Sequence, residues 1–139
     1  MSKDEDTINN LIAEVRVLES TYNELSSRQS LLERILIESK SSLDTVNGLS
    51  ASPSDEVLIP VGGGVLLRAS PPKTEKVLLN IGANVVLEKT RADAVKFIES
   101  RVGELEGDIE AVASQRSQIA QRLDSDRRAL QSLLNRQGQ

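Results

Sequence analysis

Residues 57–70 read VLIPVGGGVLLRAS, in which three consecutive glycines separate two short apolar runs. A second pair of runs, KVLLNI and VVLEK, lies within residues 76–89 on either side of Gly82-Ala83-Asn84. Short β-rich runs with a few turn-forming residues between them predict β-hairpins. The middle of the chain is therefore predicted to form two successive hairpins joined by the segment SPPKTE, with Pro60 at an edge or irregular position.

The glycine triplet at residues 62–64 has two interpretations, because glycine-rich turns can also cradle phosphates. A Walker A loop needs a Lys soon after its glycines, and a dinucleotide fingerprint needs glycines that open a helix. Here the strand-like run VLLRAS follows the triplet. The triplet is therefore interpreted as the turn of the first hairpin.

The apolar residues of the four runs stand next to one another instead of alternating with polar residues. Such runs indicate strands that are buried on both faces, which two isolated hairpins cannot achieve in water. Their edges would also leave backbone N–H and C=O groups unpaired. We therefore expect these strands to form an interface with other chains. The residues expected at this oligomer interface are Val57, Leu58, Ile59, Val65, Leu66, Leu67, Val77, Leu78, Leu79, Val85, Val86 and Leu87.

The two segments that flank the hairpins carry heptad patterns. In each flank, alternating steps of three and four select twelve positions, of which ten are apolar. A seam of this length predicts a coiled coil. The first seam consists of Ile8, Leu11, Val15, Leu18, Tyr22, Leu25, Gln29, Leu32, Leu36, Ser39, Leu43 and Val46. The second seam consists of Val95, Ile98, Val102, Leu105, Ile109, Val112, Arg116, Ile119, Leu123, Asp126, Leu130 and Leu133.

Two seams of equal length around a reversing β segment predict an antiparallel coiled coil within one chain. Each helix would be roughly 65–70 Å long. Pairing Val46 with Val95 places Val15 near Asp126, so both termini are expected at the same end of the coiled coil, far from the hairpins. The interruptions Gly103 and Gly107 fall on outward positions of this register.

The expected boundaries follow from local signals. Asn47-Gly48 is a helix stop, and Thr90 followed by Asp93 resembles a capping box at the start of the second helix. The predicted fold class is α+β: a long antiparallel helical coiled-coil hairpin with two β-hairpins between the helices, through which the chain associates with other chains. Its segments are a first helix at residues 1–48, an oligomerisation module at 49–89 and a second helix at 90–139, within one domain overall.

Composition removes several classes of function. The chain of 139 residues has no Cys and no His, so it lacks the commonest metal ligands and the commonest general base. Its net charge of −4 shows no basic stripe of the kind that binds nucleic acid. Its longest apolar runs are about five residues, against the roughly 20 that span a bilayer. A cytoplasmic protein is expected that is not an enzyme, does not bind a membrane, and has no metal and no cofactor.

Two charged clusters in the sequence are candidate sites. The alternating carboxylates of Glu104, Glu106, Asp108 and Glu110 could serve acid/base or metal chemistry, but no apolar cleft is apparent that would perturb their pKa values. We interpret them as a solvated helix face.

The basic residues Arg127 and Arg128, with Arg122 nearby, form the other cluster. They could bind an acidic partner surface, or they could be ordinary surface charge that Asp124 and Asp126 balance locally. The sequence leaves both interpretations open.

The apolar stripe is wider than a strict seam near both termini. Ile12 lies beside Leu11 and Val15, and Leu134 lies beside Leu133. The additional residues either stiffen the coiled coil or act as exposed anchors for apolar segments of other proteins.

The order helix, two β-hairpins, helix resembles the prefoldin family, and specifically an α-type, archaeal-like subunit. The resemblance rests on VLIPVGGGVLLRA, on NIGANVVLEKTRADAVKFIESRV and on the flanking heptads. Two hairpins instead of one distinguish α-type from β-type subunits in this family. Val85-Val86 stand where many members have aromatic residues, a departure that leaves the strand assignment intact.

The resemblance implies a hexamer of two α and four β subunits, in which the hairpins build a double β-barrel and six coiled coils project from it. It also implies ATP-independent capture of unfolded proteins at the coiled-coil tips and their transfer to a group II chaperonin. Capture requires the seam to open at the tip, which the polar seam residues Arg116 and Asp126 would favour. The residues expected to contact clients are Ile8, Leu11, Ile12, Val15, Leu123, Leu130, Leu133 and Leu134.

Two other classes of function compete with this one. The chain could be a structural scaffold or adaptor whose coiled coil binds one folded partner. It could also be an enzyme subunit or a nucleic-acid-binding arm, which the absence of His, Cys and a basic stripe argues against.

Overall fold

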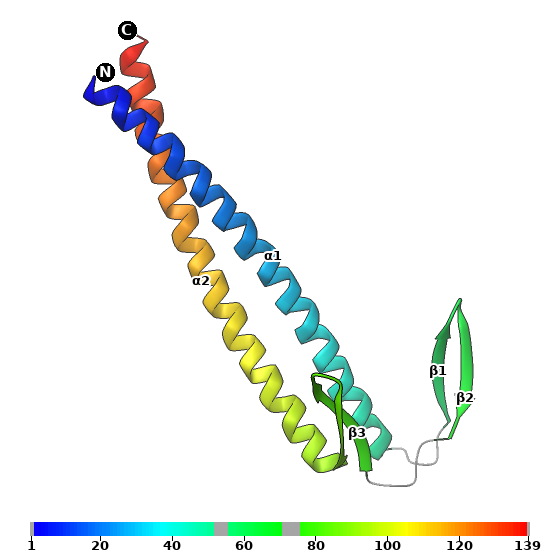
Figure 1. The fold of residues 1–139 in the computed structure, drawn as a ribbon. Coiled ribbons are helices and arrows are strands. Elements are labelled where there is room, and N and C mark those ends of the chain that lie inside the picture. Colours follow the sequence, from blue (N-terminus) through cyan, green and yellow to red (C-terminus); the bar gives the residue numbers. More distant parts are fainter. Residues whose placement is uncertain (1, 52–55, 71–75, 139) are drawn as a thin grey trace. The chain divides into compact units, whose positions relative to one another are not determined.

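The computed structural model describes residues 2–51, 56–70 and 76–138, and it contains two helices around two β-hairpins (Figure 1). The predicted α+β arrangement is therefore confirmed, whereas most of the predicted connection SPPKTE lies outside the described residues. The elements in chain order are α1 at Lys3–Ala51, β1 at Val57–Gly62, β2 at Val65–Ala69, β3 at Lys76–Gly82, β4 at Val85–Thr90 and α2 at Arg91–Gln137.

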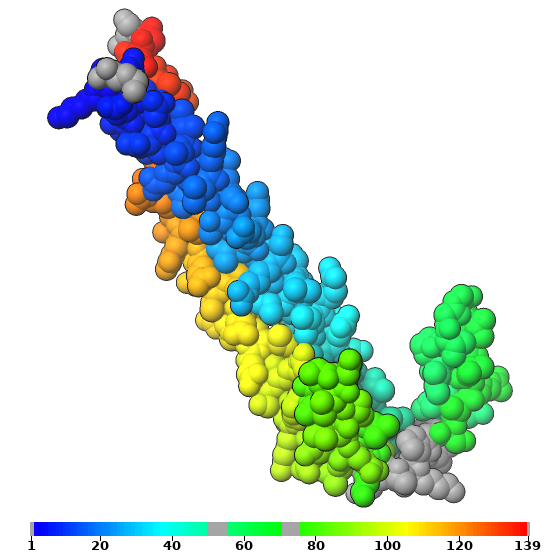
Figure 2. Space-filling view, in the orientation of Figure 1, coloured from blue at the N-terminus to red at the C-terminus, as the bar shows by residue number. Residues whose placement is uncertain are grey.

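The chain divides into two compact units. The first unit consists of Met1–Ile35 and Leu105–Gln139, and the second is Leu36–Glu104. In the first unit α1 and α2 run antiparallel, and the N- and C-terminal ends lie together, as the blue and red segments of Figure 2 show. Both features agree with the predicted pairing of the two seams.

The seams form the core within each unit. Every predicted seam residue of α1 and α2 is buried or half-buried, whereas Gly103 and Gly107 are exposed, as predicted. A heptad pattern keeps these residues on one face of each helix, so they meet when the helices pack. The apolar seam residues with the least exposure, all at or below 8%, are Ile8, Leu105, Val112, Leu123 and Leu133, and the polar Asp126 is buried to the same degree.

The two hairpins share one design. In the first, antiparallel pairing runs from Val57 opposite Ala69 to Gly62 opposite Val65, with an irregularity between Pro60 and Gly62. Pro60 lies opposite Leu66 in a sheet of two strands, so it occupies an edge strand beside a bulge, as predicted.

The second hairpin repeats this geometry. Its pairing runs from Lys76 opposite Thr90 to Gly82 opposite Val85, with an irregularity between Asn80 and Gly82. The amide of Gly82 donates a hydrogen bond of 2.9 Å to Oδ1 of Asn80, which supports the backbone at the bulge.

The turns explain the glycines of the opening sequence. Gly63 and Gly64 have φ of 60° and 78°, and the equivalent Ala83 and Asn84 have φ of 51° and 61°. Positive φ at both central residues defines the turn whose twist matches that of a two-residue hairpin. The triplet is therefore a hairpin turn, as predicted.

The predicted start of α2 agrees with the structure, whereas the predicted end of α1 does not. The amide of Asp93 donates a hydrogen bond of 3.1 Å to Oγ1 of Thr90, which confirms Thr90 as the N-cap of α2. The predicted stop of the first helix at Asn47-Gly48 is wrong, because α1 continues to Ala51. Gly48 does not adopt the positive φ that would end the helix there, and an interior Gly only weakens a helix by about 1 kcal/mol.

The cap gives a first prediction. Thr90→Ala should lower the free energy of unfolding by about 1 kcal/mol, because it removes the acceptor for an otherwise unpaired amide of the first turn. Urea unfolding of the full chain, followed by circular dichroism, measures this change.

Thr45→Ala is the matched control in the same unit. Thr45 is exposed in the interior of α1, and its hydroxyl only donates back to the carbonyl of Ser41 at 3.0 Å. Because Ala has the higher helix propensity, this variant should be neutral or slightly more stable. Equal effects of the two substitutions would contradict the role assigned to the cap.

Candidate functional site

The residues expected to contact clients all lie in the first unit, on the segments nearest the two termini. Ile8, Leu123 and Leu133 are buried between the helices, with exposed fractions of 5–8%. Leu134 has 46% of its surface exposed, and the other four expected residues are half-buried. Leu134 is therefore directly available to another protein, and the remaining side chains become fully available only when the helices separate.

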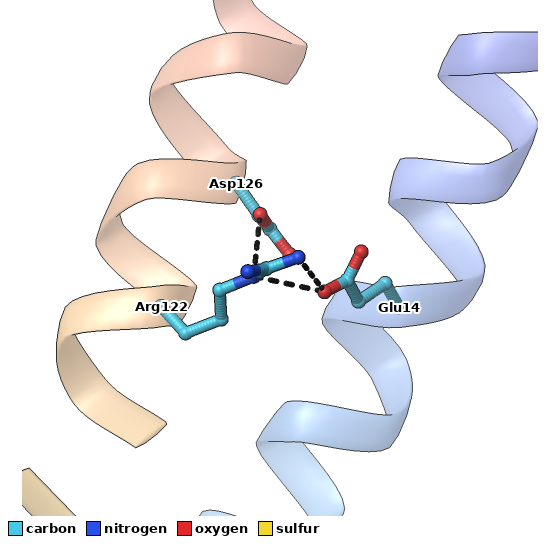
Figure 3. Close-up of polar contacts among 3 residues, drawn as sticks. All are labelled: Glu14, Arg122 and Asp126. Atoms are coloured by element: carbon cyan, nitrogen blue, oxygen red, sulfur yellow. Dashed lines mark hydrogen bonds and ion pairs between the residues drawn. The ribbon is translucent and has the colours of Figure 1, made fainter. Parts of the chain in front are cut away.

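Asp126 lies in the seam beside these apolar residues and is 6% exposed. Its Oδ1 lies 3.4 Å from Nε of Arg122, one turn away on the same helix, whereas its Oδ2 is buried without a hydrogen-bond partner (Figure 3). A buried polar atom without a partner costs about 1–3 kcal/mol. This unsatisfied oxygen supports the prediction that Asp126 weakens the seam near the termini.

Arg122 joins this carboxylate to the opposite helix. Its guanidinium lies 2.7 Å from Oε1 of Glu14, so Arg122 stands between Glu14 on α1 and Asp126 on α2 (Figure 3). The side chains of Arg122 and Glu14 are 61% and 38% exposed. Solvent screens such a pair, which contributes at most about 1 kcal/mol.

Arg116, the other charged seam residue, has the opposite surroundings. Its guanidinium donates to Oε1 of Gln29 at 2.9 Å and to the hydroxyl of Tyr22 at 3.3 Å, and it lies 5.2 Å from the centre of the Tyr22 ring. All three residues occupy predicted seam positions, but the sequence pattern did not show that they pair. Arg116 was expected to loosen the seam, and these contacts instead join the two helices there.

The basic cluster is neutralised within the chain. Arg127 lies 2.7 Å from Oε1 of Glu19 across the helices, and Arg128 lies 3.2 Å from Oδ2 of Asp124 on its own helix. With Arg122 also paired, the structure favours the interpretation as ordinary surface charge. The cross-helix partners Glu14 and Glu19 were missed, because heptad positions alone do not show how far a long side chain reaches.

The carboxylates at residues 104, 106, 108 and 110 are all exposed on α2, which agrees with a solvated helix face. Within residues 2–51, 56–70 and 76–138 no three acidic side chains gather in a way that could hold a metal ion. Neither α1 nor α2 contains a segment apolar enough to cross a membrane.

The hairpins expose apolar side chains on both faces in the single chain. Ile59 lies opposite Leu67 on one face of the first hairpin, and Leu66 lies opposite Pro60 on the other. Of the twelve expected interface residues, Val57, Val77 and Leu79 are half-buried and the other nine are exposed. The sequence interpretation left out Val61 and Ile81, which are 55% and 41% exposed at the bulges. Each is an apolar residue directly before the glycine that ends its strand, and this pattern could have identified both.

One face of the second hairpin and the start of α2 line a pocket of about 480 Å³. Its apolar wall is formed by Leu79, Ile81, Leu87 and Phe97, and Lys89 and Asp93 also line it. Phe97, the single phenylalanine of the chain, is 38% exposed and was not predicted as part of any site. This pocket enlarges the apolar surface that the β segment leaves uncovered.

The chain has two helices that pack through their apolar seams, and two hairpins between them whose apolar residues are exposed. This arrangement is that of a coiled-coil subunit with a β segment for assembly. Comparison with known proteins makes this class specific. The family model described as "Prefoldin subunit" matches residues 18–136. The chain belongs to the prefoldin family.

Curated relatives point to the α type of subunit. The prefoldin subunit alpha of Nitrosopumilus maritimus is 28% identical over 124 residues, which cover 89% of this chain and 86% of the relative. The prefoldin subunit alpha of Methanoculleus marisnigri is 32% identical over 126 residues, which cover 81% and 85%. The resemblance to an α-type, archaeal subunit that the sequence suggested is therefore confirmed.

A solved structure agrees with the fold. The cryo-EM structure of filamentous PFD from Methanocaldococcus jannaschii superposes with a TM-score of 0.68 at 21% identity, over 81% of this chain and 94% of that chain. At this identity the likeness supports the fold alone.

The contacts of Arg116 give a second prediction. Arg116→Ala should lower the free energy of unfolding by about 1–2 kcal/mol, because it removes two hydrogen bonds from a charged donor together with the contact to the Tyr22 ring. Chemical denaturation of the full chain measures the change.

Arg127→Ala provides the comparison, since it removes the same side chain from an exposed pair. Its side chain and that of Glu19 are 57% and 47% exposed, so the loss should be about 0.5 kcal/mol. A larger loss for Arg127→Ala than for Arg116→Ala would show that the seam contact does not hold the helices together.

Proposed function

We propose that this chain is the α-type subunit of a cytoplasmic, ATP-independent chaperone without enzymatic activity. In this proposal the ends of the coiled coils capture unfolded proteins and transfer them to a group II chaperonin. The partners are β-type prefoldin subunits, in a complex of two α and four β chains. Membership in the prefoldin family carries the proposal, and the uncovered strands and the weak seam end support it.

The hairpins support assembly through the β segment. Their exposed residues are mainly aliphatic, and each two-stranded sheet has free edges on both sides. Exposed apolar surface and unpaired strand edges both favour association with further strands. Strands from neighbouring subunits would cover both faces and complete an intersubunit β-barrel.

The terminal end of the first unit supports capture of clients. It combines the exposed Leu134 with a row of apolar residues that one polar seam residue weakens. Contacts made by one such end would be weak, but several ends that hold one unfolded chain act together through effective concentration. Each contact can then remain reversible, which suits release to a second chaperone.

Assembly gives a third prediction. Leu66→Asp should prevent formation of the hexamer with β-type subunits, because it places a charge on an apolar strand face that the partner would bury. Native mass spectrometry of the mixed subunits reads out the stoichiometry. Val17→Asp is the control, since Val17 on α1 is 65% exposed and Leu66 is 54% exposed. A hexamer that forms equally well with Leu66→Asp would exclude this strand face from the interface.

Client capture gives a fourth prediction. Leu134→Ser in the assembled complex should weaken binding of an unfolded protein by about threefold or more, because burial of a Leu side chain is worth well over 0.6 kcal/mol. Leu31→Ser is the matched control, since Leu31 is 51% exposed in the same unit but is distant in sequence from both termini. Fluorescence titration with a labelled, permanently unfolded protein measures both affinities. Equal losses for the two variants would mean that apolar surface anywhere along the helices serves equally well.

Removal of residues 1–12 and 130–139 is a stronger version of the same test. It should abolish protection of clients while the hexamer still assembles. A trimmed complex that still suppresses aggregation would show that the client-binding residues lie elsewhere.

The alternative function is a scaffold or adaptor that binds one folded partner. Suppression of aggregation, measured with several unrelated unfolded proteins, separates the two functions. A chaperone protects most of these proteins, whereas a dedicated adaptor protects one or none.

A further inference from the structure

Two charged residues interrupt the seam of the first unit, and their surroundings differ. Arg116 is held from the opposite helix by Gln29 and Tyr22. Asp126 is more than nine-tenths buried, receives one contact from its own helix, and has an oxygen with no hydrogen-bond partner (Figure 3). At Arg116, polar contacts therefore join the two helices. At Asp126, one carboxylate oxygen lacks a hydrogen bond.

We propose that Asp126 is the point at which the terminal end of the coiled coil opens, and that the contacts of Arg116 stop the opening. The opened segments are the part of α1 before Tyr22 and the part of α2 after Arg116. Opening turns the apolar residues of these segments into a surface for an apolar segment of an unfolded chain, and this last step rests on the proposed function.

The free carboxylate oxygen drives the opening. In the closed seam it is buried without a hydrogen-bond donor, and separation of the helices exposes it to solvent. Helix ends are also the segments that open locally at the lowest free energy. The carboxylate therefore shifts this part of the chain toward the open state, in which its unmet hydrogen bond is satisfied.

The ion pairs do little to oppose this change. The contact between Arg122 and Asp126 lies within α2 and survives separation of the helices. The contact between Arg122 and Glu14 crosses the helices, but it is solvent-exposed and weak. The partners of Arg116 also come from the opposite helix, and these contacts are partly buried. Separation beyond that layer would break two hydrogen bonds of a charged group, so opening ends there.

Opening would uncover a defined set of side chains. Ile8 and Leu133 are 7% and 8% exposed in the closed seam, and Leu11 and Leu130 are half-buried. Together with the already exposed Leu134 they would form a continuous apolar surface. An extended apolar segment of an unfolded polypeptide matches such a surface in chemistry.

Hydrogen exchange of the full chain, read by mass spectrometry, tests the opening without any client. Asp126→Leu should slow amide exchange about tenfold or more within residues 3–14 and 124–137, because it replaces the unsatisfied carboxylate with an apolar seam residue. Asp126→Asn should slow it less, since it removes the charge but keeps a polar side chain in the seam.

Asp124→Leu is the matched control. It makes the same chemical change two residues away on an exposed side chain, which is 62% accessible, and it should leave exchange in both segments unchanged. Arg116→Ala should extend fast exchange past Tyr22 and Gln29. If Asp126→Leu exchanges like the original chain, or if Asp124→Leu slows exchange equally, Asp126 is not the opening point. An unchanged boundary in Arg116→Ala removes the assigned stop.

A capture assay with the assembled complex tests the consequence, with reduced and carboxymethylated α-lactalbumin as the unfolded probe. Asp126→Leu should bind this probe several-fold more weakly than the original complex, and Asp124→Leu should bind it equally well. If Asp126→Leu slows exchange but captures the probe normally, opening does not create the client surface. If the original complex captures no probe while Asp126→Leu still slows exchange, the proposed function fails and the opening stands.

Discussion

Each helix carries one apolar stripe, and in the first unit the other helix covers it. Most of this structure follows from that constraint, because the core is a single row of side chains and not a layered interior. Its most buried aliphatic seam residues, among them Leu105, Val112 and Leu123, are spaced along this row with one or two seam positions between them. In such a thin core one polar residue affects a whole turn of the coiled coil. The different surroundings of Arg116 and Asp126 therefore make the seam firm in one place and weak in another.

The hairpins present the same physical problem with a different outcome. Their apolar residues face both sides of a two-stranded sheet, and the chain leaves most of them exposed. The helices thus cover their apolar surface internally, whereas the strands hold theirs for association with further chains. Both arrangements fit a subunit of the prefoldin family, since the helices pack within the chain and the strands are available to other subunits.

The sequence predicted the elements of this fold well, because each had a local physical signal. The heptads identified the seams, the β-rich runs identified the four strands, and the hydroxyl of Thr90 marked the start of α2. The predicted helix end at Gly48 was wrong, since a glycine permits a helix to end but does not force it to. The pattern also placed Asp126 in the seam, but its unpartnered oxygen depends on how Arg122 divides its contacts between two carboxylates. Such side-chain geometry has no signature in heptad spacing.

The two hairpin turns have the same backbone geometry, so comparing them shows which turn positions require glycine. At the two central turn positions the first hairpin has Gly63-Gly64 and the second has Ala83-Asn84, so side chains are compatible with that backbone. The residue before them is glycine in both hairpins, with φ of 102° at Gly62 and 112° at Gly82. Residues with a Cβ are essentially confined to smaller positive φ values. Gly62 is thus the most restricted glycine of the triplet in VLIPVGGGVLLRAS, whereas Gly63 and Gly64 adopt a backbone that side chains rarely adopt but that Ala83 and Asn84 adopt in the second hairpin.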